Sequence, residues 1–439
     1  MSADPPSDRP SDDDLPPDPF PGDPFDAAAT SEQSNVRPGT TPDISELFAS
    51  LGGLGGAMGP LFQQFAAMQS QSAGLNWDVA RQIALWTASG QHVESPPDPV
   101  ERIKMEAIVR EAEKEVAAAS GLIVSSGRIS AVVTTRAGWA AQSLEDHRAL
   151  LDRLAMSLSK QPSTDVDLAE DDAADPMAAM LGMMAPMLVS TQAGALIGEL
   201  ATESMGSYDV PVPRAGPKEQ LLFVLRNIDD FAAEWSVPLE HARTHVAIIE
   251  TAMHAVLRLS HIHTTLYSLI DRFVGSYVLD PNALGDQLRD QLESFGSADP
   301  ADSGFGPVAD PSSMFETTQT PAQQEIRDGI ARVLTPIVGF VDYVAAVTGA
   351  RMLGDNRKVV EAWRRRRLSP AKGKASAAQM LGLSLDDSVL DLGSAFIGGL
   401  LQRGGPDALA ALWSSVDHLP TDNELVAPGL WLARVGLSE

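Results

Sequence analysis

Apolar side chains recur at helical spacing along most of the chain after Asn76, which indicates a mainly α protein. The range 221–225 (LLFVL) is the best strand candidate, although a short apolar run also fits a buried helix. The pattern therefore predicts a multi-helix domain with little or no β-sheet. The expected helices cover 79–86, 98–119, 137–158, 177–198, 228–234, 239–257, 261–277, 281–292, 322–347, 357–366, 376–381, 388–404 and 406–415.

The chain before residue 76 has a different character. Residues 1–42 are rich in Asp, Pro and Ser and show almost no aliphatic periodicity. Such a segment buries too little apolar surface to offset the entropy lost on ordering, so we expect a disordered acidic tail. The range 43–75 is expected to hold two short helices and a glycine-rich linker. Residues 76–439 are expected to form the helical domain.

The range 177–198 has no charged residue and is long enough to cross a membrane. However, Pro186 interrupts it, and its flanks lack the Lys or Arg residues that anchor a membrane helix. Gly194 and Gly198 form a G-x-x-x-G pattern, which pairs helices in membranes and also permits close backbone packing in soluble proteins. A buried core helix is the preferred interpretation, and a membrane segment is the alternative.

Net charge and composition exclude several classes of function. The formal net charge of −27 argues against nucleic-acid binding and against anionic membranes, because both need clustered cations. Solubility explains this charge better than a basic partner does. The chain has no cysteine, which excludes disulfides and thiolate metal ligands. The N-terminus does not look like a secretory signal, so we expect a cytoplasmic protein.

Short motifs spread over the helical domain resemble one protein family. They are NWDVAR at 76–81, STQAG at 190–194, GSYDVP at 206–211, VGFVD at 338–342, AWRRRR at 362–367 and LPT at 419–421. Together they are similar to an actinobacterial family of zinc-dependent metalloproteases, or zincin-like hydrolases, of the type associated with coenzyme F420 biosynthesis. The resemblance implies a zincin-like fold and, for the family, metal-dependent peptide hydrolysis.

The resemblance places the family's catalytic motif on the range 246–254 (VAIIETAMH). The family commonly reads His-Glu-x-x-His there, with two histidines on one helical face binding Zn²⁺ and the glutamate acting as general base. This chain has Ile249 and Met253 at the histidine positions, Val338 at the presumed third ligand position, and only Glu250 retained. Ile and Val cannot bind a metal, and a Met thioether is a poor partner for Zn²⁺. We therefore expect no zinc there and a vestigial base at Glu250.

A displaced metal site is the alternative. Glu250, His254 and His261 would share a face on one continuous helix, and zinc bound there would make the chain an active metal-dependent peptidase. Against this, Ser260-His261-Ile262-His263 looks like a helix junction, and the histidines match no recognised ligand pattern. We therefore prefer a catalytically silent family member with no cofactor, which binds a protein or peptide partner. Its groove, if one is kept, would lie around Ile249, Met253 and Val338.

Other chemistries have little support in the sequence. There is no G-x-S-x-G nucleophile elbow, no G-x-x-x-x-G-K-[ST] loop, and no G-x-G-x-x-G following a strand. The basic run Arg364–Arg367 could bind an anionic ligand or the acidic tail, but a solvated helix face is the preferred interpretation.

Overall fold

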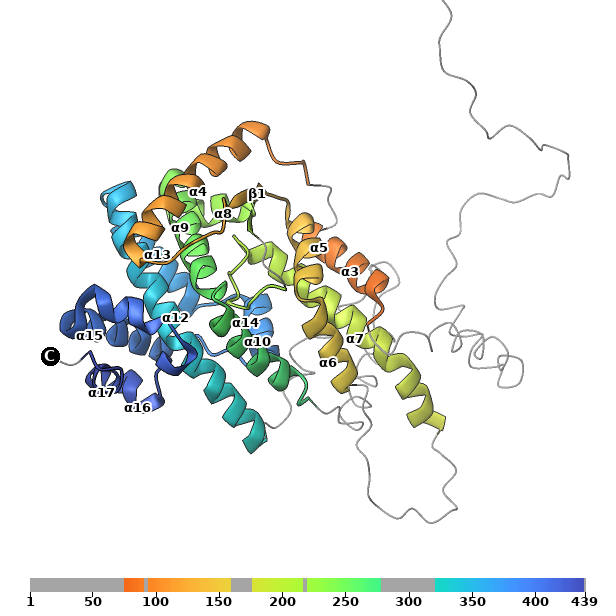
Figure 1. The fold of residues 1–439 in the computed structure, drawn as a ribbon. Helices are drawn as coiled ribbons and strands as arrows, with labels where there is room; N and C mark the ends of the chain where they lie inside the picture. Colours follow the sequence, from red (N-terminus) through yellow and green to blue (C-terminus); the bar gives the residue numbers. More distant parts are fainter. Residues whose placement is uncertain (1–74, 91–93, 159–175, 216–218, 278–319, 438–439) are drawn as a thin grey trace, which may run out of the picture. The chain divides into compact units, whose positions relative to one another are not determined.

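The computed structural model describes residues 75–90, 94–158, 176–215, 219–277 and 320–437, and for 176–188 it describes the helix but not its side chains. The described residues all belong to one compact unit, Ala66–Glu439. They are mainly helical, as the sequence predicts (Figure 1). The expected acidic tail, the short helices of 43–75 and the expected helix 281–292 lie outside the described residues.

One group of helices packs around α7, and α3, α5 and α6 lie beside α7 in Figure 1. The closest pair is α3 and α7, whose backbones touch at the G-x-x-x-G pattern. A Cβ added to Gly194 would lie 2.4 Å from the Ala80 carbonyl oxygen, and one added to Gly198 would lie 2.5 Å from the Thr87 Cβ. The glycines thus serve close packing between helices. The group comprises α3 (Trp77–Ser89), α5 (Arg136–Asp146), α6 (Arg148–Leu158), α7 (Pro176–Glu203) and α14 (Lys372–Met380).

A second group surrounds α9, which runs through the middle of the molecule in Figure 1. Among the described residues, α12 is the one helix long and apolar enough to cross a membrane, and 67% of its most hydrophobic window is buried inside the protein. It is therefore packed as a core helix is. The group comprises α4 (Pro99–Ser120), α8 (Leu225–Glu234), α9 (Leu239–Leu257), α10 (Ser260–Val274), α12 (Pro321–Leu353) and α13 (Arg357–Leu368).

Of the C-terminal helices, α15 packs against α12, and α16 and α17 pack against α15. Contact is close because Gly339 of α12 meets Gly393 of α15, where an added Cβ would lie 2.2 Å from a carbonyl oxygen. Gly405 breaks α15 with φ 62° and ψ −162°, at the boundary that the sequence predicts between two helices. The elements are α15 (Asp387–Leu412), the short 3₁₀ helix η2 (Val416–His418), α16 (Asp422–Val426) and α17 (Pro428–Arg434).

Two short parallel strands form a small sheet. The expected strand is confirmed as β2 (Gln220–Phe223), and it pairs with β1 (Ser130–Val133), which the sequence analysis did not predict. Gly206 adds an isolated antiparallel bridge to Phe223. The single helix expected over 137–158 is wrong, because His147 leaves the helical region with φ −110° and ψ 15° and separates α5 from α6.

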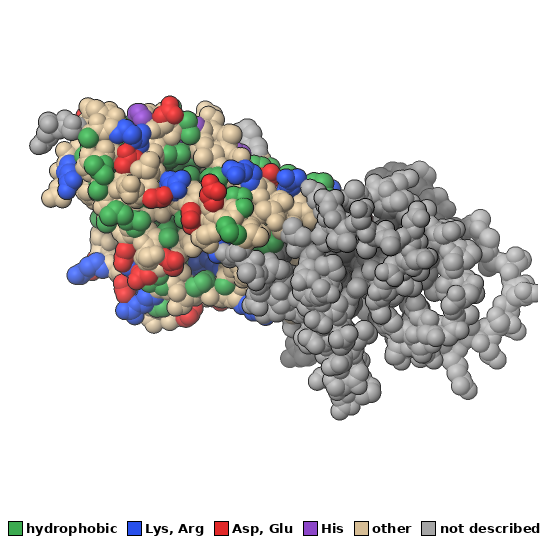
Figure 2. Space-filling model, turned by 90° about the horizontal axis from the view of Figure 1, so that it is seen from below, with side chains coloured by type: hydrophobic (Ala, Val, Ile, Leu, Met, Phe, Trp, Pro, Cys, Tyr) green, Lys and Arg blue, Asp and Glu red, His purple; other side chains and the backbone are tan. Residues whose placement is uncertain are grey.

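The surface shown in Figure 2 mixes charges of both signs. On this face of the described residues, Lys and Arg side chains alternate with Asp and Glu, and small apolar patches lie between them. A mixed surface of this kind supports solubility and offers no continuous basic field to a polyanion on that face.

Candidate functional site

The motif helix α9 is buried along most of its length. Every residue from Thr244 to Leu257 is buried, because α4, α8 and α12 pack around this part of the helix. Ile249 is 5% exposed and Met253 6%, and both belong to the contiguous hydrophobic core. Val338 on α12 is 3% exposed but is not among the residues of that core cluster. The three presumed ligand positions are therefore buried apolar side chains.

Glu250 is buried against a tight turn that follows α7. The backbone N–H of Tyr208 donates to both carboxyl oxygens, at 2.9 Å to Oε2 and 3.2 Å to Oε1, and the N–H of Ser207 donates as well. Gly206 packs directly on the carboxyl group, since an added Cβ there would lie 2.2 Å from the Glu250 Cδ. The turn thus covers both oxygens of Glu250.

The protonation state of Glu250 follows from this burial. Burial and the neighbouring Asp209 raise the pKa of Glu250 to about 8, while the backbone N–H groups of Tyr208 and Ser207 oppose that rise. At neutral pH the group is mostly the uncharged acid. An uncharged carboxyl that is covered by backbone cannot take a proton from a water molecule, so this geometry does not provide a general base.

The turn itself is held from several sides. The Trp139 indole N–H donates to the Gly206 carbonyl at 2.8 Å, and the Leu222 N–H donates to the Ser207 hydroxyl at 2.8 Å. Asp209 is buried between Arg366 and Lys374, at 3.2 Å and 2.9 Å. Burial alone would raise the pKa of Asp209, but these two cations outweigh it and hold that pKa well below its usual range. Burial lowers the pKa of Lys374 to about 8.

His254 joins the same cluster through Tyr208. Its Nδ1 lies 3.0 Å from the Tyr208 hydroxyl and its Nε2 lies 3.4 Å from Oε2 of Glu219. Because a carboxylate only accepts, Nε2 carries the proton and Nδ1 accepts from Tyr208. Burial lowers the pKa of His254 below its ordinary 6.5, although Glu219 opposes this. Both ring nitrogens are thus engaged with protein groups.

His261 lies apart from this cluster. Helix α9 ends at Leu257, and Arg258 and Leu259 connect it to α10, which begins at Ser260. His254 and His261 are therefore on separate helices, as the junction pattern predicted. His261 bonds to the backbone of Trp413, and burial lowers its pKa. In the part of the chain that the structure describes, no three or more His, Cys, Asp or Glu side chains form a group that could hold a metal ion.

Two residues of the cluster were not predicted as site residues. Tyr208 was noted only as part of the GSYDVP segment, and Glu219 was not noted at all. Both contacts join positions far apart in sequence, 46 residues for Tyr208 and His254, and 35 for Glu219 and His254. The one available signal was the predicted strand at 221–225, since Glu219 directly precedes β2.

The basic run on α13 is ion-paired. Arg366 is 17% exposed and bonds to the buried Asp209, and Arg367 is 21% exposed and bonds to Asp342 at 2.7 Å. Arg364 pairs with Asp387 and Asp391, and Arg365 pairs with Glu361. The expectation of a solvated helix face is wrong for Arg366 and Arg367, because α7, α12 and the turn that holds Asp209 supply acidic and carbonyl partners on that side.

Replacing Gly206 with Ala is expected to destabilise the protein by about 1–3 kcal/mol, because the new methyl group would overlap the Glu250 carboxyl. Chemical denaturation measures the effect. Gly127→Ala is the matched control, since an added Cβ there meets nothing within 4 Å. The double variant Gly206→Ala/Glu250→Ala should be less destabilised than the sum of the single variants, and strict additivity would contradict the contact.

Comparisons with known proteins bear on this site and its fold. A family model described as a zincin-like metallopeptidase matches residues 75–432. A crystal structure from Chloroflexus aurantiacus, described as "a putative hydrolase with a novel fold", is similar with a TM-score of 0.53 and 18% sequence identity, over 83% of this chain and 100% of that one. At this identity the similarity concerns the fold. No curated protein matches the chain.

Proposed function

Because the chain belongs to the zincin-like metallopeptidase family, we propose that it is a family member without the metal site, which acts by binding a protein or peptide partner. One observation carries the proposal. The positions at which the family resemblance expects metal ligands hold Ile249, Met253 and Val338, all of them buried and apolar.

The zinc ion that the family implies does not fit these residues. A catalytic zinc site needs three nitrogen, oxygen or thiolate ligands and an open position for water. The three apolar side chains supply no such donor, and Glu250 faces the backbone of the turn at 206–208. His254, a candidate for a displaced site, has Tyr208 and Glu219 on its two ring nitrogens. Peptide hydrolysis by metal-activated water is therefore not part of the proposed function.

We propose that this binding role is exercised in the cytoplasm and without a cofactor. The large buried core and the mixed charged surface suit a soluble binding protein. The partner is a protein or peptide, in keeping with the class of molecule on which a peptidase fold acts.

Elemental analysis of the protein, purified without a histidine tag and without chelator, tests the proposal. We expect zinc far below one equivalent per chain, unchanged in the double variant Glu250→Ala/His254→Ala. About one equivalent of zinc in the natural chain that disappears in this variant would overturn the proposal. It would instead support an active metal-dependent peptidase with a displaced site, to be checked by a peptide hydrolysis assay.

A further inference from the structure

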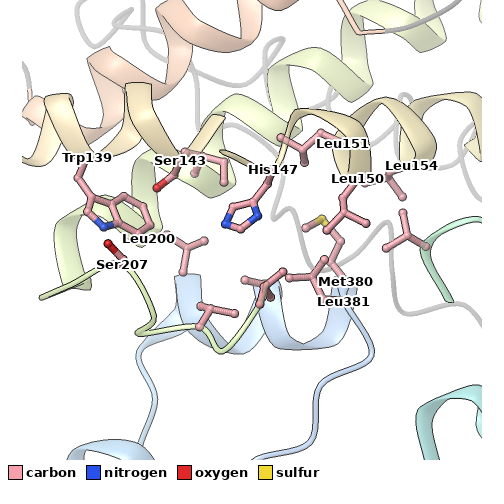
Figure 3. Close-up of a pocket in the computed structure, with 15 residues that line it drawn as sticks. Trp139, Ser143, His147, Leu150, Leu151, Leu154, Leu200, Ser207, Met380 and Leu381 are labelled. Carbon is pink, nitrogen blue, oxygen red and sulfur yellow. The ribbon is translucent and has the colours of Figure 1, made fainter. Parts of the chain in front are cut away.

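A cavity of about 40 Å³ lies between α5, α6, α7 and α14, and none of its lining residues belongs to α9. Figure 3 shows its walls, which are mostly aliphatic. Leu150 and Leu154 line it from α6, Leu200 from α7, and Met380 and Leu381 from α14 and the residue after it. An enclosed space lined in this way stays dry or accepts an apolar group.

One end of the cavity is polar, and two hydroxyl groups there have no acceptor for their protons among the described residues. Ser143 is 6% exposed, and no group in the described residues bonds to its side chain, whose oxygen is directed toward the cavity in Figure 3. The Ser207 hydroxyl accepts from the Leu222 N–H at 2.8 Å and from Arg214 Nη1 at 3.3 Å. Its own proton finds no acceptor among the described groups. Two hydroxyl groups therefore face the cavity with hydrogen bonds left to donate.

A smaller cavity of about 10 Å³ continues the first one. The two share Leu154 and Met380, and the smaller one is otherwise lined by aliphatic side chains and Gln192. Gln192 is 7% exposed, and its amide oxygen has no partner among the described residues. Met380 lines both spaces, and an unbranched thioether side chain readily changes rotamer. Rotation of Met380 would join them into one narrow slot with polar groups at both ends.

The charges behind the polar end cancel each other. Asp146 lies on the same helix as Ser143, and Arg214 bonds to Ser207. These two residues form a buried ion pair, with 2.6 Å between Arg214 Nε and Asp146 Oδ2. His147 also lines the cavity, but among the described lining residues no side chain carries a permanent charge that could pair with a charged ligand, and burying such a ligand would cost several kcal/mol. The slot is thus suited to an uncharged head group.

We propose that this slot binds a short aliphatic molecule with an uncharged, oxygen-bearing head group, of the alcohol or primary amide class. The head group accepts hydrogen bonds from Ser143 and Ser207, and the hydrocarbon chain lies along Leu154, Leu200 and Met380. A water needs roughly 10–15 Å³ of such space, so the larger cavity alone holds about three or four heavy atoms. A longer chain displaces Met380. The site is independent of whether α9 holds a metal.

Thermal unfolding and ligand-observed NMR of the full chain, with the straight-chain alcohols from propanol to octanol, test this proposal. We expect saturable binding of one molecule per chain, strongest at an intermediate length, with dissociation constants on the order of millimolar or below. Ser143→Ala should weaken binding of the best alcohol about 5- to 10-fold and leave xenon binding unchanged, because only the head-group bond is lost. Leu154→Trp should abolish the binding of both the alcohol and xenon.

Ser157→Ala is the matched control. Ser157 is a buried serine on α6 whose hydroxyl already bonds to the carbonyls of Leu154 and Val274, so its loss should leave alcohol affinity unchanged. If Leu154→Trp fails to fold, Ala377→Leu fills the same cavity from α14 and should abolish binding in its place. The proposal is overturned if no alcohol binds saturably, or if Ser143→Ala and Ser157→Ala weaken binding equally. Either result would leave only a packing void.

Discussion

The triple variant Ile249→His/Met253→His/Val338→Glu is expected to bind about one zinc ion per chain, against far less than one expected for the natural chain. Two histidines four residues apart on α9 share one face, and α12, which carries position 338, packs against α9. The new polar groups are buried, so without metal they should lower the free energy of unfolding by several kcal/mol. Zinc at a hundredfold excess over its dissociation constant should then stabilise the folded variant by about 3 kcal/mol, a rise of ~3–5 °C in the melting temperature for a domain of this size.

Elemental analysis and thermal unfolding with and without zinc measure this result. The variant Ile249→Ala/Met253→Ala/Val338→Ala is the control, because it disturbs the same core positions without adding ligands. Its melting temperature should not respond to zinc. A triple ligand variant that folds but binds no zinc would show that α9 and α12 do not direct these positions to a common point. The absence of ligand side chains at 249, 253 and 338 would then not be the sole reason for the low zinc content that we expect of the natural chain.

The helical part of the fold is largely readable from the sequence. The helix predicted over 239–257 has the same bounds as α9. Its periodic apolar residues begin after Pro238 and end just before the connection to α10 at Ser260. β1 was missed because Ser130–Val133 is too short to show a pattern and becomes a strand only by pairing with β2, 90 residues away along the chain at Ser130↔Gln220. Local periodicity carries no information on such a partner.

The same limit applies to the site. The absence of ligand side chains at 249, 253 and 338 can be read from residue chemistry together with the family resemblance. The surroundings of Glu250 cannot, because the turn at 206–208 reaches it from 42 residues away. Arg366 looked like a surface cation for the same reason, since its partner Asp209 is 157 residues distant. In this structure Glu250 serves to anchor the turn after α7.

Replacing Glu250 with Gln should remove a pH-dependent penalty on folding. The pKa of Glu250 is raised from 4.5 to about 8 in the folded protein. Below pH 4.5 both states hold the proton, and folding carries no penalty. Between pH 4.5 and about 8 the folded state still binds a proton that the unfolded state has released, so the free energy of unfolding falls as the pH rises through this range. The total decrease in the free energy of unfolding is ~3–5 kcal/mol, and the uncharged Gln side chain of the Glu250→Gln variant shows no such decrease.

Urea denaturation of the natural chain and of Glu250→Gln between pH 5 and 9 measures the difference directly. Gln has a fixed cost, because its amide N–H₂ meets the backbone N–H groups of the turn, but that cost does not vary with pH. The stability of the natural chain relative to Glu250→Gln should therefore fall steadily up to about pH 8. Glu101→Gln is a control without pH dependence, since hydrogen bonds from Lys104 and Arg243 lower the pKa of Glu101 and its carboxylate is ionised in both folded and unfolded states across this range. A difference independent of pH would mean that the folded protein holds Glu250 as a carboxylate, stabilised by the N–H groups of Ser207 and Tyr208.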